Sequence, residues 1–169
     1  ALKFNTSSIM IGLLMASYSI AQFFAAPLLG YFSDKIGRKP VLLLSKFGTV
    51  LSYLILAVSQ SYTLFLIARL LDGFTGGNIS VVRAYVADVT SEKDRPKGMA
   101  IIGISFGFGF IIGPAIGGLI YQNNLDHTLA ALIAGGASLL AFIFTLLFLK
   151  EPKKRASLKK KPSLVKGLL

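Results

Sequence analysis

The chain contains no cysteine and no tryptophan, one histidine, and only 15% charged residues. Without cysteine it can form neither a disulfide nor a zinc site built on thiolates. Soluble domains carry roughly 25% charged residues, so this composition lies outside their usual range. The one histidine, His127, follows Asp126 in a short polar segment and is expected to be an ordinary loop residue. No catalytic dyad, metal cluster or phosphate-binding loop is present in the sequence, which argues against an enzyme.

Apolar residues are abundant instead, at 54% of the chain, with a mean hydropathy of +0.70. They form five stretches that approach or exceed the length of about 20 residues needed to cross a bilayer. Each stretch is expected to be helical, because a membrane span must satisfy its own backbone hydrogen bonds. The sequence therefore predicts an all-α membrane protein, a helical bundle with transmembrane helices at residues 9–32, 41–58, 64–87, 99–121 and 129–149.

The positive charge is distributed unevenly between the two sides of this bundle. The chain has a net charge of +11, but its basic residues lie in short connections and in a tail, which argues against a nucleic-acid partner. By the positive-inside rule, the basic side faces the cytoplasm. Lys46 and Arg83 lie within apolar stretches toward that side and are expected to snorkel to the membrane surface. The basic side comprises residues 33–40, 88–98 and 150–169 with 14 Lys and Arg, whereas the other side has only Lys3.

The first two apolar stretches are joined by a charged segment that reads GYFSDKIGRK. An acid and a base one helical turn apart, bracketed by two glycines, predict a tight, charge-dense hairpin at the membrane surface. The pattern resembles motif A, the cytoplasmic loop signature of the major facilitator superfamily. Its fixed positions here are Gly30, Asp34, Gly37, Arg38 and Lys39.

This resemblance implies a register for the whole chain. A half of a superfamily transporter has six spans, and the motif A loop joins its second helix to its third. The first stretch here would match the second helix, so we expect an N-terminal half without its first helix. Residues 1–149 would form the transmembrane bundle, and the basic residues 150–169 a cytoplasmic linker toward a missing C-terminal bundle. The chain begins with Ala rather than Met, which fits a fragment.

The third stretch carries ionisable residues in its interior, which is rare and usually indicates a cavity or a partner. Arg69 and Asp72 are three residues apart and can pair on one helical face. On a continuous helix they share a stripe about 80° wide with Gly76, Ser80 and Arg83. The stretch resembles motif B of the superfamily, which implies a role in proton coupling at the transport cavity. The alternative is a structural ion pair that only orients the helix.

The fourth stretch contains a glycine pattern with two doublets, GFIIGPAIGG. Glycines at every fourth position make a smooth ridge that lets another helix approach closely. The internal proline removes one backbone donor and bends the helix. The pattern resembles motif C, the antiporter signature of the drug:proton antiporter branches, and the alternative is a generic packing face. Its residues are Gly109, Gly113, Pro114, Gly117 and Gly118.

A second cytoplasmic connection begins at Asp88 and resembles the D-x(6)-R loop of the same family. Asp88 is expected on the same side of the membrane as Asp34 and Arg38. The resemblance implies that these three charges form a latch between the two halves of a transporter. Residues 92–97 are expected to be an ordinary solvated loop.

Together these motifs imply a multi-pass protein of the cell membrane that exports small amphiphilic molecules, such as drugs or tetracycline-like compounds, in exchange for protons. It would work by alternating access as part of a larger transporter. The proton gradient would be its coupling ion, and no other cofactor is expected. Two alternatives stay open: an importer or uniporter of sugars or metabolites, and a truncated membrane fragment that transports nothing.

Overall fold

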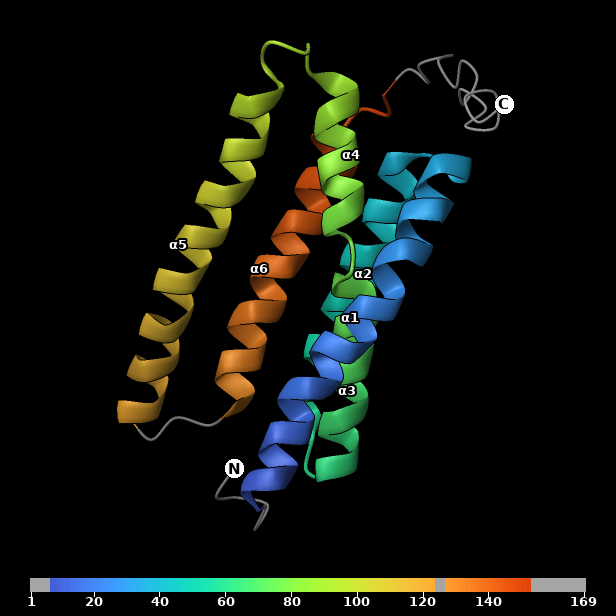
Figure 1. Ribbon diagram of the computed structural model, residues 1–169. Helices are drawn as coiled ribbons and strands as arrows, with labels where there is room; N and C mark the ends of the chain where they lie inside the picture. The colour runs from blue at the N-terminus through green and yellow to red at the C-terminus, as the bar shows by residue number, and fades with distance from the viewer. Residues whose placement is uncertain (1–6, 124–126, 153–169) are drawn as a thin grey trace, which may run out of the picture.

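The computed structural model describes residues 7–123 and 127–152, and all regular secondary structure in these ranges is helical. Figure 1 shows the helices running side by side along one common direction. Lys3 and most of the predicted basic tail lie outside the described residues. The helices are α1 (Ser8–Ile36), α2 (Arg38–Val58), α3 (Tyr62–Gly76), α4 (Ile79–Val89), α5 (Arg95–Gln122) and α6 (His127–Phe148).

Five segments of the described chain are long and apolar enough to cross a membrane. Each overlaps one of the five predicted stretches, so the prediction of an all-α fold with five transmembrane helices is confirmed. Bulky apolar side chains such as Phe23 and Phe110 are about three-quarters exposed, as expected of surfaces that face lipid. The five segments are Ser8–Ile36, Arg38–Val58, Tyr62–Val89, Arg95–Ile120 and His127–Phe148.

The connection between the first two helices is shorter than the predicted charged hairpin. Helix α1 continues to Ile36 and α2 begins at Arg38, so Gly30 lies inside a helix and Gly37 alone makes the turn. Gly37 has φ 111°, a conformation that L-residues with a side chain rarely adopt. A Cβ at this position would also lie 2.8 Å from an oxygen of Glu151. The turn can therefore be a single residue because that residue is glycine.

The third predicted stretch is not one continuous helix. Helix α3 ends at Gly76 and α4 begins at Ile79, and the break lies beside α1 and α2. The Ser45 hydroxyl donates a hydrogen bond to the Thr75 carbonyl, and the Gln22 amide donates one to the Gly76 carbonyl at 3.3 Å. Irregular backbone at membrane depth is tolerated where protein groups satisfy it in this way. Side chains of two neighbouring helices therefore stabilise the break.

Small residues allow the helices to approach closely. Helix α1 packs against α3, and α2 packs against both α3 and α6. A Cβ on Gly73 would collide with the Tyr18 carbonyl oxygen of α1, and one on Gly48 would collide with the Thr75 side chain of α3. Most of the buried side chains are Ala, Ser, Val or Leu. Such interfaces are typical of helices that associate within lipid, where close backbone contact replaces a large apolar core.

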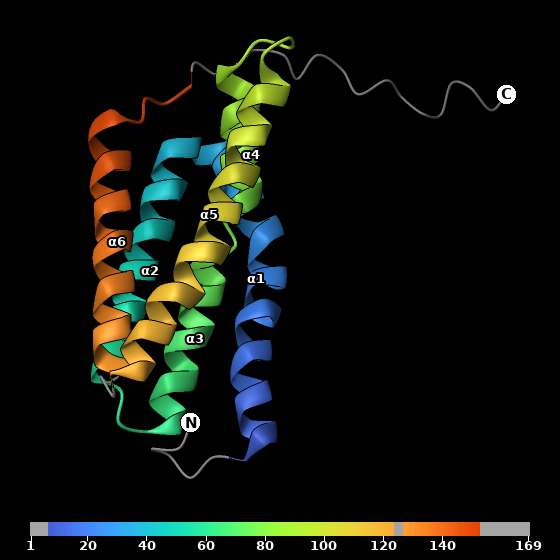
Figure 2. The same cartoon turned by 90° about the vertical axis from the view of Figure 1, so that its left-hand side faces the viewer.

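Helix α5 stands apart from the helices of this core at one side of the bundle (Figure 1), the side that faces the viewer in Figure 2. Ile120, near its C-terminal end, is its one buried residue among those that the structure describes. Its main contacts are with α4 and α6. A long apolar helix is thus left with most of its surface uncovered within this chain.

Candidate functional site

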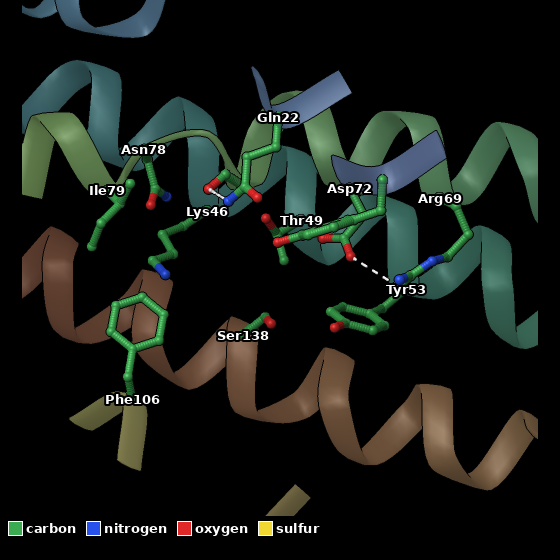
Figure 3. A pocket seen from close by; sticks show the side chains of 12 residues that line it. Gln22, Lys46, Thr49, Tyr53, Arg69, Asp72, Asn78, Ile79, Phe106 and Ser138 are labelled. Carbon is green, nitrogen blue, oxygen red and sulfur yellow. Dashed lines mark hydrogen bonds and ion pairs between the residues drawn. The ribbon is translucent and has the colours of Figure 1, made fainter. Parts of the chain in front are cut away.

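A cavity of about 370 Å³ lies between the helices, and all six helices contribute to its lining. Its volume is within the range of about 300 to 1,000 Å³ that is common for sites that bind small molecules. Figure 3 shows polar and aromatic side chains that converge on this space. The lining residues are Tyr18, Gln22, Lys46, Thr49, Tyr53, Arg69, Asp72, Gly76, Asn78, Ile79, Phe106 and Ser138.

Arg69 and Asp72 form the predicted ion pair at the wall of this cavity. Arg69 Nη1 lies 3.6 Å from Asp72 Oδ2, and the two residues are one turn apart on α3. The guanidinium also lies over the ring of Tyr18, 4.9 Å from its centroid, in a cation–π contact. Asp72 is 7% exposed. A carboxylate this buried needs its cation, because an unpaired buried charge is strongly destabilising.

The predicted polar stripe of the third stretch is only partly present. Gly76 lines the cavity together with the ion pair, but Ser80 and Arg83 do not. The Ser80 hydroxyl instead donates a hydrogen bond to the Ala26 carbonyl of α1 at 3.1 Å. The stripe was drawn for a continuous helix, and the break after Gly76 separates α4 from the face that α3 presents. The exposed position of Arg83 is compatible with the snorkelling expected of it.

The prediction that Lys46 snorkels is wrong. Its side chain extends from α2 into the cavity, toward the ring of Phe106 on α5 (Figure 3). A signal for this orientation exists in the sequence. Ser45, Thr49 and Ser52 recur at helical spacing around Lys46 in an otherwise apolar stretch. Such a polar stripe indicates that this side of α2 faces the bundle interior rather than lipid.

The cytoplasmic charge cluster assembles around Arg38. Its Nη1 lies 2.7 Å from Asp34 Oδ1, and its Nε donates to Asp88 Oδ2 at 3.0 Å. The same Nη1 also donates to the Ser33 hydroxyl at 2.6 Å. The three predicted charges thus come together from α1, α2 and α4. Arg38 is largely buried by these contacts, whereas Asp34 remains mostly exposed.

Sequence reasoning missed Glu151, which joins this cluster from beyond α6. Its two carboxylate oxygens accept hydrogen bonds from the backbone N–H groups of Arg38 and Lys39, both at 2.7 Å. A carboxylate at the beginning of a helix satisfies free N–H groups and interacts favourably with the helix dipole. Lys39 completes the connection by donating to the Leu146 carbonyl at 2.8 Å. The sequence did offer a signal for this contact, because Glu151 is an isolated acid in a strongly basic segment.

The glycine ridge of α5 does not join the cavity. A Cβ built on Gly109, Gly113, Gly117 or Gly118 meets nothing within 4 Å. Pro114 lies inside the helix beside this ridge. The ridge is therefore available to a helix from outside the described residues.

The remaining candidate, His127, begins α6 at the end of the bundle opposite the charge cluster. Its Nε2 lies 3.2 Å from the Ser59 carbonyl oxygen. Within the part of the chain that the structure describes, no group of three or more His, Cys, Asp or Glu residues could hold a metal ion. His127 is thus the first residue of a helix rather than the expected loop residue, and it links α6 to the end of α2. Asp126 lies outside the described residues.

Comparisons with known proteins agree with the helical bundle and its charged motifs. The profile of the family described as Major Facilitator Superfamily matches residues 1–168. The chain therefore belongs to the major facilitator superfamily, whose members are multi-pass membrane transporters of small molecules.

Its relatives include proteins of two kinds. The chain is 42% identical over 154 residues to the bovine (Bos taurus) major facilitator superfamily domain-containing protein 10, covering 89% of this chain and 33% of that protein. It is 37% identical to the class H tetracycline resistance protein of Pasteurella multocida, covering 91% and 38%. A crystal structure of the human organic anion transporter MFSD10 (TETRAN) superposes with a TM-score of 0.75 at 39% identity, covering 83% and 32%. The chain spans about one third of the length of these relatives.

Proposed function

We propose that this chain is part of the N-terminal bundle of a proton-coupled exporter that moves small amphiphilic molecules by alternating access. The observation that carries the proposal is the cavity with a buried ion pair, Arg69 and Asp72, on its wall. Ionisable residues within membrane spans mark substrate and proton pathways. The cavity would bind the transported molecule, and the ion pair would take part in proton exchange.

The coupling follows from the chemistry of the two residues. Arg69 holds its proton under all physiological conditions, so it cannot act as the carrier. Asp72, or a carboxylate from another part of the transporter, would bind and release the proton. Arg69 would determine how strongly that carboxylate holds it, and movement of the guanidinium would link protonation to the conformational change.

The cytoplasmic cluster and the glycine ridge would serve the conformational cycle. The cluster of Asp34, Arg38 and Asp88 ties three helices together at one end of the bundle, where it would latch this bundle to the other. The α5 ridge would pack against the second bundle. We place the cluster on the cytoplasmic side of the cell membrane, in accordance with the basic connections and tail.

The relatives do not point to a single substrate. Some are named tetracycline resistance proteins, and one solved structure is titled an organic anion transporter. Efflux of drugs or tetracycline-like molecules is the function that we favour, because the glycine pattern of α5 resembles the antiporter signature. Importers and uniporters of the superfamily, and a fragment without transport activity, are the alternatives.

The decisive experiment uses the intact gene product that contains these residues, reconstituted in liposomes with tetracycline as the probe. An acidic lumen should drive tetracycline into the liposomes as protons leave. A protonophore should abolish this accumulation. Equilibration that ignores the pH gradient would indicate a uniporter and contradict the proposal. If neither tetracycline nor any member of a panel of small amphiphiles moves, the result would favour the non-transporting alternative.

The latch is tested by Asp34→Asn. Arg38 keeps its contacts with Asp88 and Ser33 in this variant, so the bundle itself should lose less than about 1 kcal/mol, as for an exposed pair. The expected effect is a changed balance between the inward-open and outward-open states of the transporter. Because this chain has no cysteine, a single cysteine at Ser138 reports on the cavity, with any cysteine beyond the chain replaced by serine. An impermeant thiol reagent should label it at an altered rate from one side.

The matched control for this measurement is Asp94→Asn. Asp94 directly precedes α5 and pairs at 3.6 Å with Lys97 in the first turn of that helix, so the solvated loop expected for residues 92–97 ends at Asp94. Both side chains are exposed. Its removal should leave the labelling rate unchanged. Equal labelling of wild type, Asp34→Asn and Asp94→Asn would mean that the charge cluster is only part of a tight turn.

A further inference from the structure

Lys46 gives the cavity a positive charge that nothing in the described chain balances. The cavity lining has three ionisable groups besides its tyrosines: Lys46, Arg69 and Asp72. Arg69 and Asp72 are paired with each other. Among the described residues, the Lys46 ammonium has no ion-pair or hydrogen-bond partner. Two cations therefore face one carboxylate, and the positive charge in excess is that of Lys46.

The location of this ammonium is informative, because cations within membrane spans normally reach water or pair with an acid. Lys46 does not snorkel, because its side chain points into the cavity rather than along α2 toward the membrane surface (Figure 3). It lies near enough to Asp72 for their charges to interact, yet beyond ion-pair distance. The ammonium is thus held in a small-molecule cavity with its hydrogen-bond donors available.

The groups around Lys46 suit a molecule with a flat apolar part and one anionic group. Phe106 lies beside the lysine, and the rings of Tyr18 and Tyr53 line the same cavity from α1 and α2. Thr49 and Asn78 add neutral polar groups near the ammonium. Aromatic walls with a small number of placed polar groups are the usual composition of a small-molecule site.

We infer that Lys46 is the anion-binding group of this cavity and that it selects small aromatic organic anions over cations of the same size. The carboxylate or other acidic group of the ligand would pair with the ammonium, and its ring would lie among the aromatic side chains. The inference rests on the proposed function, because it takes this cavity as the place where the transported molecule binds. A competing role for Lys46 is an ion pair with a carboxylate from outside the described residues.

The test measures binding of two radiolabelled probes that share one ring system and differ in charge, 2-naphthoate and 2-naphthylmethylammonium. The intact gene product is placed in lipid nanodiscs, and empty nanodiscs give the background. Wild type should bind naphthoate more tightly than the ammonium probe. A hydrogen bond to a charged group contributes about 1.5 to 3 kcal/mol, so Lys46→Met should weaken naphthoate binding by about tenfold to a hundredfold. Binding of the ammonium probe should not weaken.

Two further variants separate the charge of Lys46 from its packing. Lys46→Arg keeps the positive charge and should restore most of the naphthoate affinity. Lys93→Met removes a lysine from the exposed connection after α4 and should change neither probe. Retained binding of the ammonium probe by Lys46→Met would show that this variant is folded.

The outcomes distinguish this inference from the proposed function. Equal affinity of wild type for both probes, no affinity for naphthoate, or unchanged naphthoate binding in Lys46→Met overturns the anion site, and the last result supports the competing ion pair. Proton-driven transport by wild type would leave the proposed function standing in each of these cases. Conversely, selective loss of naphthoate binding in Lys46→Met, with no pH-driven transport by wild type, supports the anion site and overturns proton coupling.

Discussion

Substitution of Arg69 by Ala should uncouple transport from the pH gradient. The guanidinium is 3.6 Å from the Asp72 carboxylate, whose side chain is 10% exposed, and it lies over the Tyr18 ring. Removal of one partner of a buried pair costs about 3 to 5 kcal/mol in other proteins. Arg69 is partly exposed to the cavity, so the cost in stability should be smaller than this. Independently of stability, loss of the cation that would control the coupling carboxylate should lower gradient-driven exchange at least about tenfold, which corresponds to about 1.4 kcal/mol.

The measurement compares variants of the intact gene product in liposomes, with and without a pH gradient. Arg69→Ala should still insert in the membrane and should move substrate at the same low rate under both conditions. Arg83→Ala is the matched control, because Arg83 lies in the same membrane segment but is exposed and does not line the cavity. If Arg69→Ala exchanges protons for substrate at the wild-type rate with the same pH profile, the ion pair only orients α3.

Leucine at Gly113 should impair exchange without disturbing the fold of this bundle. A Cβ at Gly113 meets nothing within 4 Å, so the larger side chain projects away from the helices of this chain. It would instead separate α5 from any helix that packs on the ridge, since such ridges depend on close backbone approach. We expect a loss of most exchange activity, with normal insertion and thermal stability.

The contrasting variant is Gly73→Leu, at a glycine inside the bundle. A Cβ there would collide with the Tyr18 carbonyl and lie 3.0 Å from the Ala21 Cβ of α1. Overpacking typically costs about 1 to 3 kcal/mol, so this variant should unfold at a lower temperature in detergent. Thermal unfolding and liposome exchange, measured on both variants, separate the two roles. Wild-type exchange by Gly113→Leu would reduce the α5 pattern to an ordinary glycine-rich face.

Sequence reasoning predicted the number of spans, their helical nature and the pairing of several charged residues. These features depend on local quantities. Span length is set by bilayer thickness, and the pairing of Arg69 with Asp72 or of Asp34 with Arg38 follows from helical spacing of three or four residues. The approach of Asp88 to Arg38 is not local. It was expected because the two connections lie on the same side of the membrane and because both resemble cytoplasmic loops of the superfamily.

The tertiary structure decided the features that depend on which neighbour a backbone or side chain meets. The break after Gly76 is stabilised by Ser45 and Gln22, which lie on two other helices. Glu151 reaches the beginning of α2 because α6 packs along α2. No periodicity within α3 or in the basic tail predicts these contacts.

Lys46 shows most clearly which features depend on the sequence and which on the tertiary structure. Its position in an apolar stretch was evident from the sequence, and either snorkelling or an inward orientation would satisfy a lysine near a helix end. The packing of α2 against α3 and α6 turns this side of the helix toward the cavity, where aromatic side chains from α1 and α5 also converge. The sequence by itself thus determined that the chain is a helical membrane bundle with charges inside it. Which of those charges face one shared cavity was decided by helix packing, because the direction of a side chain depends on neighbours far away along the chain.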